Sequence, residues 1–223
     1  NDQRDGYIKN TFGGDLMGKN TKAARASFRY LASEKTTIDL QVDFQDDDAP
    51  GVAFLRKDVP NTKGEFGIFG VDASLEQGED LTTEKTNLNT NLKVRHNFSD
   101  ELSLTSISSY FEHSAFERYD SDGTAARAFD ATTEVISDQI YQELRLQLAK
   151  EKYMLTFGGS YITEDVRTND IWQWDERAMY MFLLSAPNMV DSSGNPVLPP
   201  ALPSFMGGLP LSDFHSEGYF VDA

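Results

Sequence analysis

Strict alternation of apolar and polar residues is the clearest pattern along the chain. Residues 36–45 read TTIDLQVDFQ, in which every second residue from Ile38 to Phe44 is apolar and the residues between them are polar. A period of two places successive side chains on opposite faces of a β-strand. The segment therefore predicts a strand that separates an apolar medium from a polar one.

The alternation recurs at lengths close to the roughly 9 to 11 residues that a tilted strand needs to cross a bilayer. The predicted strands are 22–31, 36–45, 88–95, 102–110, 142–148 and 153–161, with a weak strand at 5–10 and the start of another at 217–223. Tight turns at 33–35, 99–101 and 150–152 alternate with long connections at 46–85, about 116–134 and about 167–216. This segregation is typical of an outer-membrane barrel with short periplasmic turns and long extracellular loops.

Two features depart from clean alternation. Ile107 and Phe111 fall on the parity opposite to Leu102, Leu104 and Tyr110, which predicts a β-bulge near Ser108. Gln142 interrupts the apolar parity of its strand, and the sequence alone does not explain it.

Composition and charge narrow the choice of class. With 39% hydrophobic residues and a mean hydropathy of -0.48, the chain has no run near 18 apolar residues, so a spanning helix is excluded. The absence of cysteine excludes disulfides and thiolate chemistry. A net charge of -16 without clustered Lys and Arg argues against nucleic-acid binding. No nucleophile, base and orienting group occur at a recognisable spacing, so neither an enzyme nor a cofactor is predicted.

Metal-binding motifs are weak. His96, His113 and His215 are too far apart in sequence to show a ligand spacing. Residues 120–123, DSDG, resemble the start of a calcium loop, but Ala131 stands where the closing Glu of an EF-hand would be. An acidic loop turn is the preferred interpretation of this segment and of the acidic run 46–48, and no metal site is predicted.

Charged residues on the polar parity of the strands form the first group of candidate site residues. They are Arg25, Arg29, Asp39, Asp43, Lys93, Arg95, Glu143 and Arg145. In a barrel these side chains face the lumen, where they would contact a protein segment inside it or an anionic solute. The competing interpretation is that the bases pair with the three acids across the inner wall.

Aromatic residues in the connection 167–216 form the second group. Trp172, Trp174, Tyr180 and Phe182 are candidate substrate contacts, because exposed aromatic side chains often anchor ligands. Residues 175–185 also favour a short helix, which would instead pack its apolar face into the barrel mouth.

Five segments, taken in order, carry a resemblance to a known family. They are DGYIKN (5–10), AARASFRY (23–30), NLKVRHNFSDELSLTSISSY (91–110), QELRL (142–146) and YMLTFGGSY (153–161). Together they resemble the barrel domain of TonB-dependent outer-membrane receptors. The resemblance implies a barrel of about 22 strands around a plug, in the outer membrane of a Gram-negative bacterium. It also implies active uptake of a scarce nutrient such as a ferric siderophore, cobalamin or a glycan.

On this basis residues 1–223 are expected to be part of the barrel domain, contributing about seven to eight meandering antiparallel strands and no plug domain. The expected partners are the remaining barrel strands, the lipid bilayer, the nutrient and the TonB complex, which would act through the missing plug. Two other classes remain open. One is a small self-contained outer-membrane barrel with a structural or adhesive role, and the other is a soluble carbohydrate-binding β-sandwich.

Overall fold

The computed structural model describes residues 1–125, 128–174, 205–208 and 212–222, and within them the protein is all-β. Six long strands pair antiparallel with their neighbours in chain order. They are β4 (Lys19–Ser33), β5 (Thr36–Pro50), β6 (Thr82–Asn97), β7 (Leu102–Asp120), β8 (Phe129–Lys150) and β9 (Tyr153–Trp174). No helix in the described part of the chain is long and apolar enough to cross a membrane.

Shorter strands complete the arrangement. β1 (Asp2–Arg4) pairs with the start of β4, while β10 (Phe205–Gly208) and β11 (Ser212–Asp222) follow one another along the same edge of β9. These strands form one nine-stranded sheet with the six long ones. β2 (Ile8–Lys9) and β3 (Asp15–Leu16) form a separate two-stranded sheet, and the 3₁₀ turn η1 (Gly78–Asp80) precedes β6.

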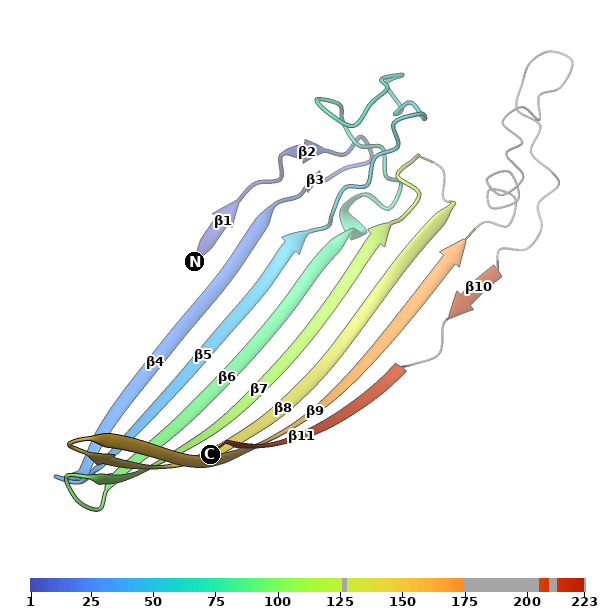
Figure 1. The fold of residues 1–223 in the computed structure, drawn as a ribbon. Helices are drawn as coiled ribbons and strands as arrows, with labels where there is room; N and C mark the ends of the chain where they lie inside the picture. Colours follow the sequence, from blue (N-terminus) through green and yellow to red (C-terminus); the bar gives the residue numbers. More distant parts are fainter. Residues whose placement is uncertain (126–127, 175–204, 209–211, 223) are drawn as a thin grey trace, which may run out of the picture.

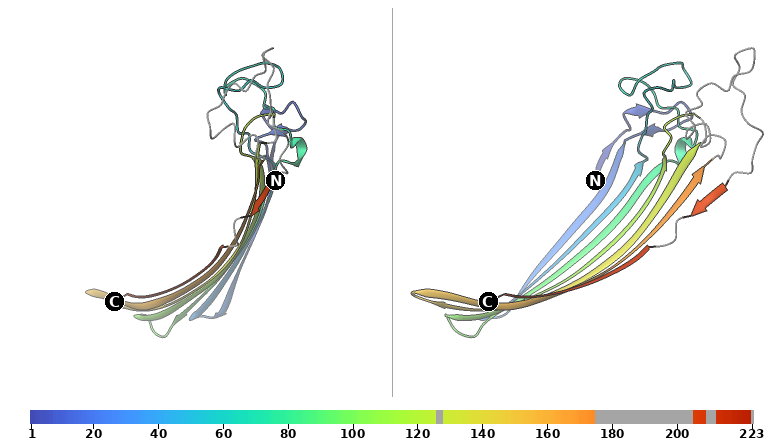
Figure 2. Two further views of the ribbon diagram at one scale, coloured as in Figure 1. Left: turned by 90° about the vertical axis from the view of Figure 1, so that its right-hand side faces the viewer. Right: turned by 45° about the vertical axis from the view of Figure 1, so that its right-hand side comes forward.

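The long strands form a single curved layer, seen edge-on in Figure 2. The three tight turns gather at one end of this layer, and the longer connections gather at the other end with the N-terminal segment (Figure 1). We call the latter the loop end. The predicted hairpins are therefore confirmed, together with the segregation of tight turns from longer connections.

Strand lengths differ from the prediction, because the ladders continue beyond the alternating segments. β5 runs to Pro50 and β6 starts at Thr82, so the connection predicted at 46–85 is only 51–81. The connection between β7 and β8 is likewise 121–128 rather than about 116–134. The first strand was predicted wrongly at 5–10, since β1 is the strand that pairs with β4. The last strand begins at Ser212, earlier than predicted.

The predicted bulge near Ser108 is wrong. The pairing of β7 with β6 and with β8 passes Ser108 without a register shift. Ile107 and Phe111 simply belong to the opposite face, where Ile107 is the rung neighbour of Lys93 and Glu143. The Phe111 and His113 rings are nearly parallel, with 5° between their planes and 6.4 Å between their centroids.

The registers keep the parities aligned, so that the sheet has one apolar face and one polar face. A single row across five strands contains Tyr30, Ile38, Val94, Ser106 and Leu144. The side chains of the apolar face are strongly exposed, with 62% for Phe28, 52% for Leu144 and 52% for Phe157. Among the described residues, Ala131 is the one buried apolar residue in the long strands. The sheet therefore has no hydrophobic core of its own.

The buried apolar residues are found at the loop end, in a small unit that we call the cap (residues 5–18 and 51–81). Leu16, Ala73, Leu75 and Leu81 form its core. Asn10 crosses this core, donating from Nδ2 to the Leu75 carbonyl at 2.8 Å and accepting the Leu75 N–H at 2.9 Å. The backbone N–H and C=O of the buried residue Leu75 therefore both have hydrogen-bond partners, as burial requires.

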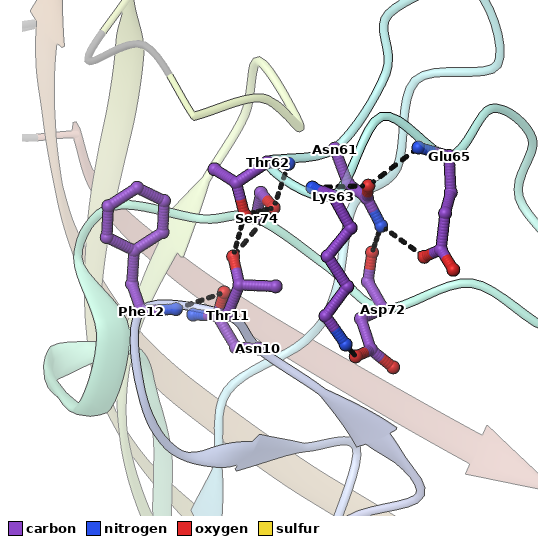
Figure 3. Close-up of polar contacts among 9 residues, drawn as sticks. All are labelled: Asn10, Thr11, Phe12, Asn61, Thr62, Lys63, Glu65, Asp72 and Ser74. Atoms are coloured by element: carbon purple, nitrogen blue, oxygen red, sulfur yellow. Dashed lines mark hydrogen bonds and ion pairs between the residues drawn. The ribbon is translucent and has the colours of Figure 1, made fainter.

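A polar network continues from this core along the surface of the cap (Figure 3). The Asn61 Oδ1 accepts the backbone N–H groups of Lys63 and Glu65, and its Nδ2 donates to the Asp72 carbonyl at 3.0 Å. The Ser74 hydroxyl meets that of Thr11 at 2.7 Å. The Asn61 bonds thus order the 51–81 connection internally, and the hydroxyl contacts of Thr11 with Ser74 and Thr62 hold it against the N-terminal segment.

Close backbone approach also requires glycine in the cap. A Cβ at Gly6 would lie 2.3 Å from the Asp15 carbonyl oxygen, and one at Gly51 would lie 2.8 Å from Leu81. Both distances are shorter than real Cβ contacts allow. The glycines therefore let the N-terminal segment and the connection lie against their neighbours.

Candidate functional site

The eight charged residues predicted to share one face do share it. Arg25 is the rung neighbour of Asp43, and Arg29 is that of Asp39, which in turn is opposite Lys93. Glu143 lies in the same row, two strands beyond Lys93, and Arg95 and Arg145 occupy the next row. The hairpin registers bring residues from β4, β5, β6 and β8 onto this single polar face.

Ion pairs join several of these residues across or along the strands. Arg29 Nε lies 2.5 Å from Asp39 Oδ1, and the second Arg29 nitrogen, Nη2, donates to Asp39 Oδ2 at 3.2 Å. Arg25 pairs with Asp43, and Arg145 pairs with Glu143. All three predicted acids are thus paired with bases, as the second interpretation expected. Exposed pairs of this kind contribute about 0–1 kcal/mol each.

A hollow of about 570 Å³ extends over strands β6 to β9 on this face, and positive charge is in excess there. Its lining includes Lys93, Arg95 and Arg145 but only one carboxylate, that of Glu143. Tyr141 donates its hydroxyl to Glu143 at 2.6 Å, which fixes the carboxylate on the side of Arg145. Guanidinium groups offer planar, paired donors to carboxylate and phosphate, so the hollow suits an anionic group.

Uncharged polar side chains extend the polar face toward the loop end. Asn91 links Asn89 and Ser109, through a 3.0 Å bond from its amide and a 2.5 Å bond to its carbonyl oxygen. His113 Nδ1 lies 2.8 Å from Asn87 Oδ1. His96 is on the other face, bonded to Thr36 and against the ring of Phe98. His96 and His113 are thus committed to local partners in different rows.

Gln142 is a polar residue on the apolar face whose role the sequence did not explain. Its Oε1 accepts the Ser108 hydroxyl at 2.5 Å, and its Nε2 donates to Ser106 Oγ at 3.1 Å. The three polar groups satisfy one another within an apolar surface. The hairpin register carries the signal, because it places Ser106 opposite Leu144 and Ser108 opposite Gln142 on the same face.

Of the four aromatic candidates, the two that the structure describes lie on a strand. Trp172 lies on β9, half-buried, with its ring stacked on Phe129 at 5.1 Å between centroids and 24° between planes. Trp174 is the last residue of the same strand. Tyr180, Phe182 and the predicted helix 175–185 lie outside the described residues. Trp172 therefore packs within the ladder, which corrects its expected position in a loop.

Comparison with known proteins adds no assignment. No protein-family model and no curated protein matches the chain.

Proposed function

We propose that the chain is part of the barrel wall of a TonB-dependent receptor in the outer membrane of a Gram-negative bacterium. The observation that carries the proposal is the exposed apolar face of a single-layer antiparallel sheet whose other face is polar. In water, such a surface would far exceed the few hundred Å² that soluble proteins usually expose. Against lipid tails it is the expected exterior of a barrel.

The extent of the apolar face supports a bilayer as its partner. On β8 it runs from Ile140 to Leu148, which is about 26 Å along the strand at about 3.3 Å per residue. With a tilt of about 40°, this becomes about 20 Å along the membrane normal, close to the about 25 Å apolar band of known barrels. Toward the loop end, the same parity turns polar in one row of Glu112, Asp138 and Asp165.

Aromatic residues lie near both limits of this band. Tyr30 and Tyr153 are close to the tight turns, whereas Phe44 lies in the row of Glu112 and Tyr110 lies one row from it. Tyrosine rings favour the interface depths of a bilayer because one end is apolar and the other forms hydrogen bonds. These positions support the proposed orientation of the strands across the membrane.

The edges of the sheet support the need for further strands. In the described residues, β4 beyond Thr21 pairs only with β5, and β11 pairs only with β9. Unpaired backbone groups cost several kcal/mol each within hydrocarbon. We therefore assign the remaining strands of a larger barrel as the partners of both edges. A plug inside that barrel would connect transport to the TonB complex.

The basic hollow gives the polar face a role in this proposal. Lys93, Arg95 and Arg145 would attract the carboxylate or phosphate groups of a nutrient, or acidic residues of a plug. A ferric siderophore or a similar iron chelate is the proposed cargo, with cobalamin or a glycan as other members of the same substrate class.

The competing sandwich needs a second layer over the apolar face. Within the described residues the one other sheet is β2–β3, which has two strands and belongs to the cap at the loop end. A sandwich would bury side chains such as Leu144 and Phe157, which are half-exposed here. The observations therefore favour the membrane proposal over a soluble carbohydrate-binding protein.

The reading frame on both sides of this chain provides the first test. An upstream plug domain behind a secretory signal, with further alternating strands downstream, would support the receptor. Start and stop codons directly flanking Asn1 and Ala223 would overturn it. A second test compares uptake of labelled ferric siderophore in cells with and without the gene. Equal uptake under iron limitation would exclude that cargo.

A further inference from the structure

Three carboxylates from separate segments meet at the loop end, and we call them the acidic cluster. They belong to Glu76 in the cap, Asp120 at the end of β7 and Asp130 near the start of β8. One oxygen of each lies within 4.8 Å of the other two. Asp120 and Asp130 are also direct rung neighbours. Like charges directly opposite one another destabilise a sheet, so this arrangement needs an explanation.

Burial makes the cluster more demanding than a surface group of acids. Asp120 is 0% exposed and Asp130 is 4% exposed. The Asp120 Oδ1 accepts the backbone N–H groups of Asp122 at 3.0 Å and Gly123 at 2.9 Å. Its Oδ2 is buried and has no hydrogen-bond partner among the described residues, and the same holds for both carboxylate oxygens of Glu76. Acceptor atoms of a buried carboxylate are therefore left facing other carboxylates.

The environment disfavours the charged form of these groups. Burial, followed by the nearby charge of Asp122, raises the pKa of Asp120 to about 8. Burial, followed by the charge of Asp130, also raises the pKa of Glu76. Two arrangements can relieve such a cluster, which are protons held between the carboxylates or a bound cation.

We propose that Glu76, Asp120 and Asp130 bind a divalent cation, and that the ion is Ca²⁺. Carboxylate oxygens are the ligands of hard cations, and nitrogen or sulfur ligands favoured by transition metals do not contribute to this cluster. Calcium binds oxygen at about 2.3–2.6 Å, so its ligands are at most about 5 Å apart. The mutual distances within the cluster satisfy this limit without rearrangement.

The DSDG segment contributes to this site in an unexpected way. Asp122 orders the turn, since its carboxylate accepts the N–H groups of Thr124 at 2.9 Å and Phe129 at 2.8 Å. Asp120 instead directs its free oxygen to the acidic cluster. The sequence motif therefore supplies one ligand and one turn-forming residue, while the other two ligands come from elsewhere in the chain.

The ion would fasten the cap to the sheet. Phe54 of the cap already contacts Tyr119 of β7, with ring centroids 5.8 Å apart. A Cβ at Gly123 would lie 3.1 Å from the Phe54 backbone, so the two segments are in close contact there. Glu76 is the cap ligand, and the other two ligands belong to adjacent strands. The site does not depend on transport and would exist in a barrel of any function.

Calcium binding to the intact protein in detergent tests the proposal. After treatment with EDTA, CaCl₂ is titrated by isothermal titration calorimetry, and cleavage of the 51–81 connection by a protease is followed at each concentration. We expect one bound Ca²⁺ and slower cleavage of the connection. A tenfold excess of Mg²⁺ should leave Ca²⁺ binding in place, because Mg²⁺ loses its water reluctantly.

Matched variants make the assignment specific. Asp120→Asn and Glu76→Gln should each weaken Ca²⁺ binding at least tenfold, since each removes one negative charge from the acidic cluster. Asp58→Asn is the control, since its carboxylate is in the same connection but is exposed and pairs with Arg56. Absence of binding at 10 mM CaCl₂ would overturn the proposal. Unchanged binding in Glu76→Gln, or displacement of Ca²⁺ by equimolar Mg²⁺, would also overturn it.

Discussion

Substitution of Leu144 by arginine tests whether the apolar face contacts lipid. Leu144 lies midway between Ile140 and Leu148 on β8, so the proposed membrane position is near the bilayer midplane. Its side chain is 52% exposed, and its rung neighbours are the small residues Ser106 and Gly159. An arginine there would meet hydrocarbon without an acidic partner in the rungs beside it.

The expected cost follows from the depth of the residue. Arginine on the lipid face of a barrel costs about 2–4 kcal/mol at the midplane and about 0–1 kcal/mol near the interfaces. Leu144→Arg should therefore shift the folding equilibrium in lipid by about 30-fold to 900-fold. In a soluble protein an exposed leucine replaced by arginine usually changes stability by about 0.5 kcal/mol or less.

Ile107→Arg provides the matched control. Ile107 is an aliphatic residue at nearly the same depth, one rung from Leu144, but it lines the hollow on the polar face beside Glu143. This variant should cost at most about 1 kcal/mol, since the new charge remains solvated and lies between the Glu143 carboxylate, which attracts it, and the Lys93 ammonium, which repels it. Both variants of the intact protein are unfolded by guanidinium in phospholipid vesicles, and tryptophan fluorescence reports the transition.

The comparison of faces gives a clear refutation. If Leu144→Arg and Ile107→Arg are equally stable, the two faces are not in different media and the barrel proposal fails. A larger loss in Ile107→Arg would mean that the polar face is the one in contact with lipid. Parallel measurement in water without detergent would then test the sandwich.

Three further substitutions test other parts of the fold. Gln142→Leu leaves the Ser106 and Ser108 hydroxyls without a partner on the apolar face and should lower the free energy of unfolding by about 1–3 kcal/mol. Adding Ser106→Ala and Ser108→Ala should restore most of that stability, and no recovery in guanidinium unfolding would contradict this pairing. Asn10→Ala leaves the Leu75 N–H unpaired and removes one of the two hydrogen bonds to the Leu75 carbonyl, which also accepts the Gly78 N–H, so protease should cleave the 51–81 connection faster while hydrogen exchange in β5 stays unchanged; uniform destabilisation would contradict a separate cap. In this cysteine-free chain, Phe69→Cys, at a residue 88% exposed, should react with an impermeant maleimide on intact cells, whereas Lys35→Cys in a tight turn should react only after lysis; the reverse labelling would invert the orientation.

Alternation was sufficient to predict the hairpins, because within the apolar band each strand has one apolar and one polar face. It failed where that contrast ends. Beyond the row of Glu112 and Asp138, apolar residues such as Ile136 and Val135 fall on both parities among polar ones, so the pattern disappears although the hydrogen-bonded ladder continues to Asp120 and Phe129. The strands were therefore predicted too short and the connections too long.

The wrong bulge has a different cause. It assumed that every apolar residue of β7 must lie on the apolar face. Ile107 and Phe111 instead contribute aliphatic and aromatic surface to the polar face, where Phe111 stacks with His113. The register fixed by the tight turn at 98–101 was the more reliable guide to which face each β7 residue occupies. A one-residue slip would move every following side chain to the other face, which the ladder pairing does not allow.

The two ends of the molecule differ in how polar groups find their partners, and this difference limits what sequence can predict. In the ladder, the register places partners directly opposite one another on neighbouring strands, as in Arg29 with Asp39 and Gln142 with Ser108. A correctly predicted hairpin therefore also predicts which polar residues pair. In the cap, the bonds join groups 65 residues apart, as between Asn10 and Leu75, and no periodicity relates them. The acidic cluster combines both kinds of contact: its two strand ligands follow from register, whereas Glu76 depends on the cap fold.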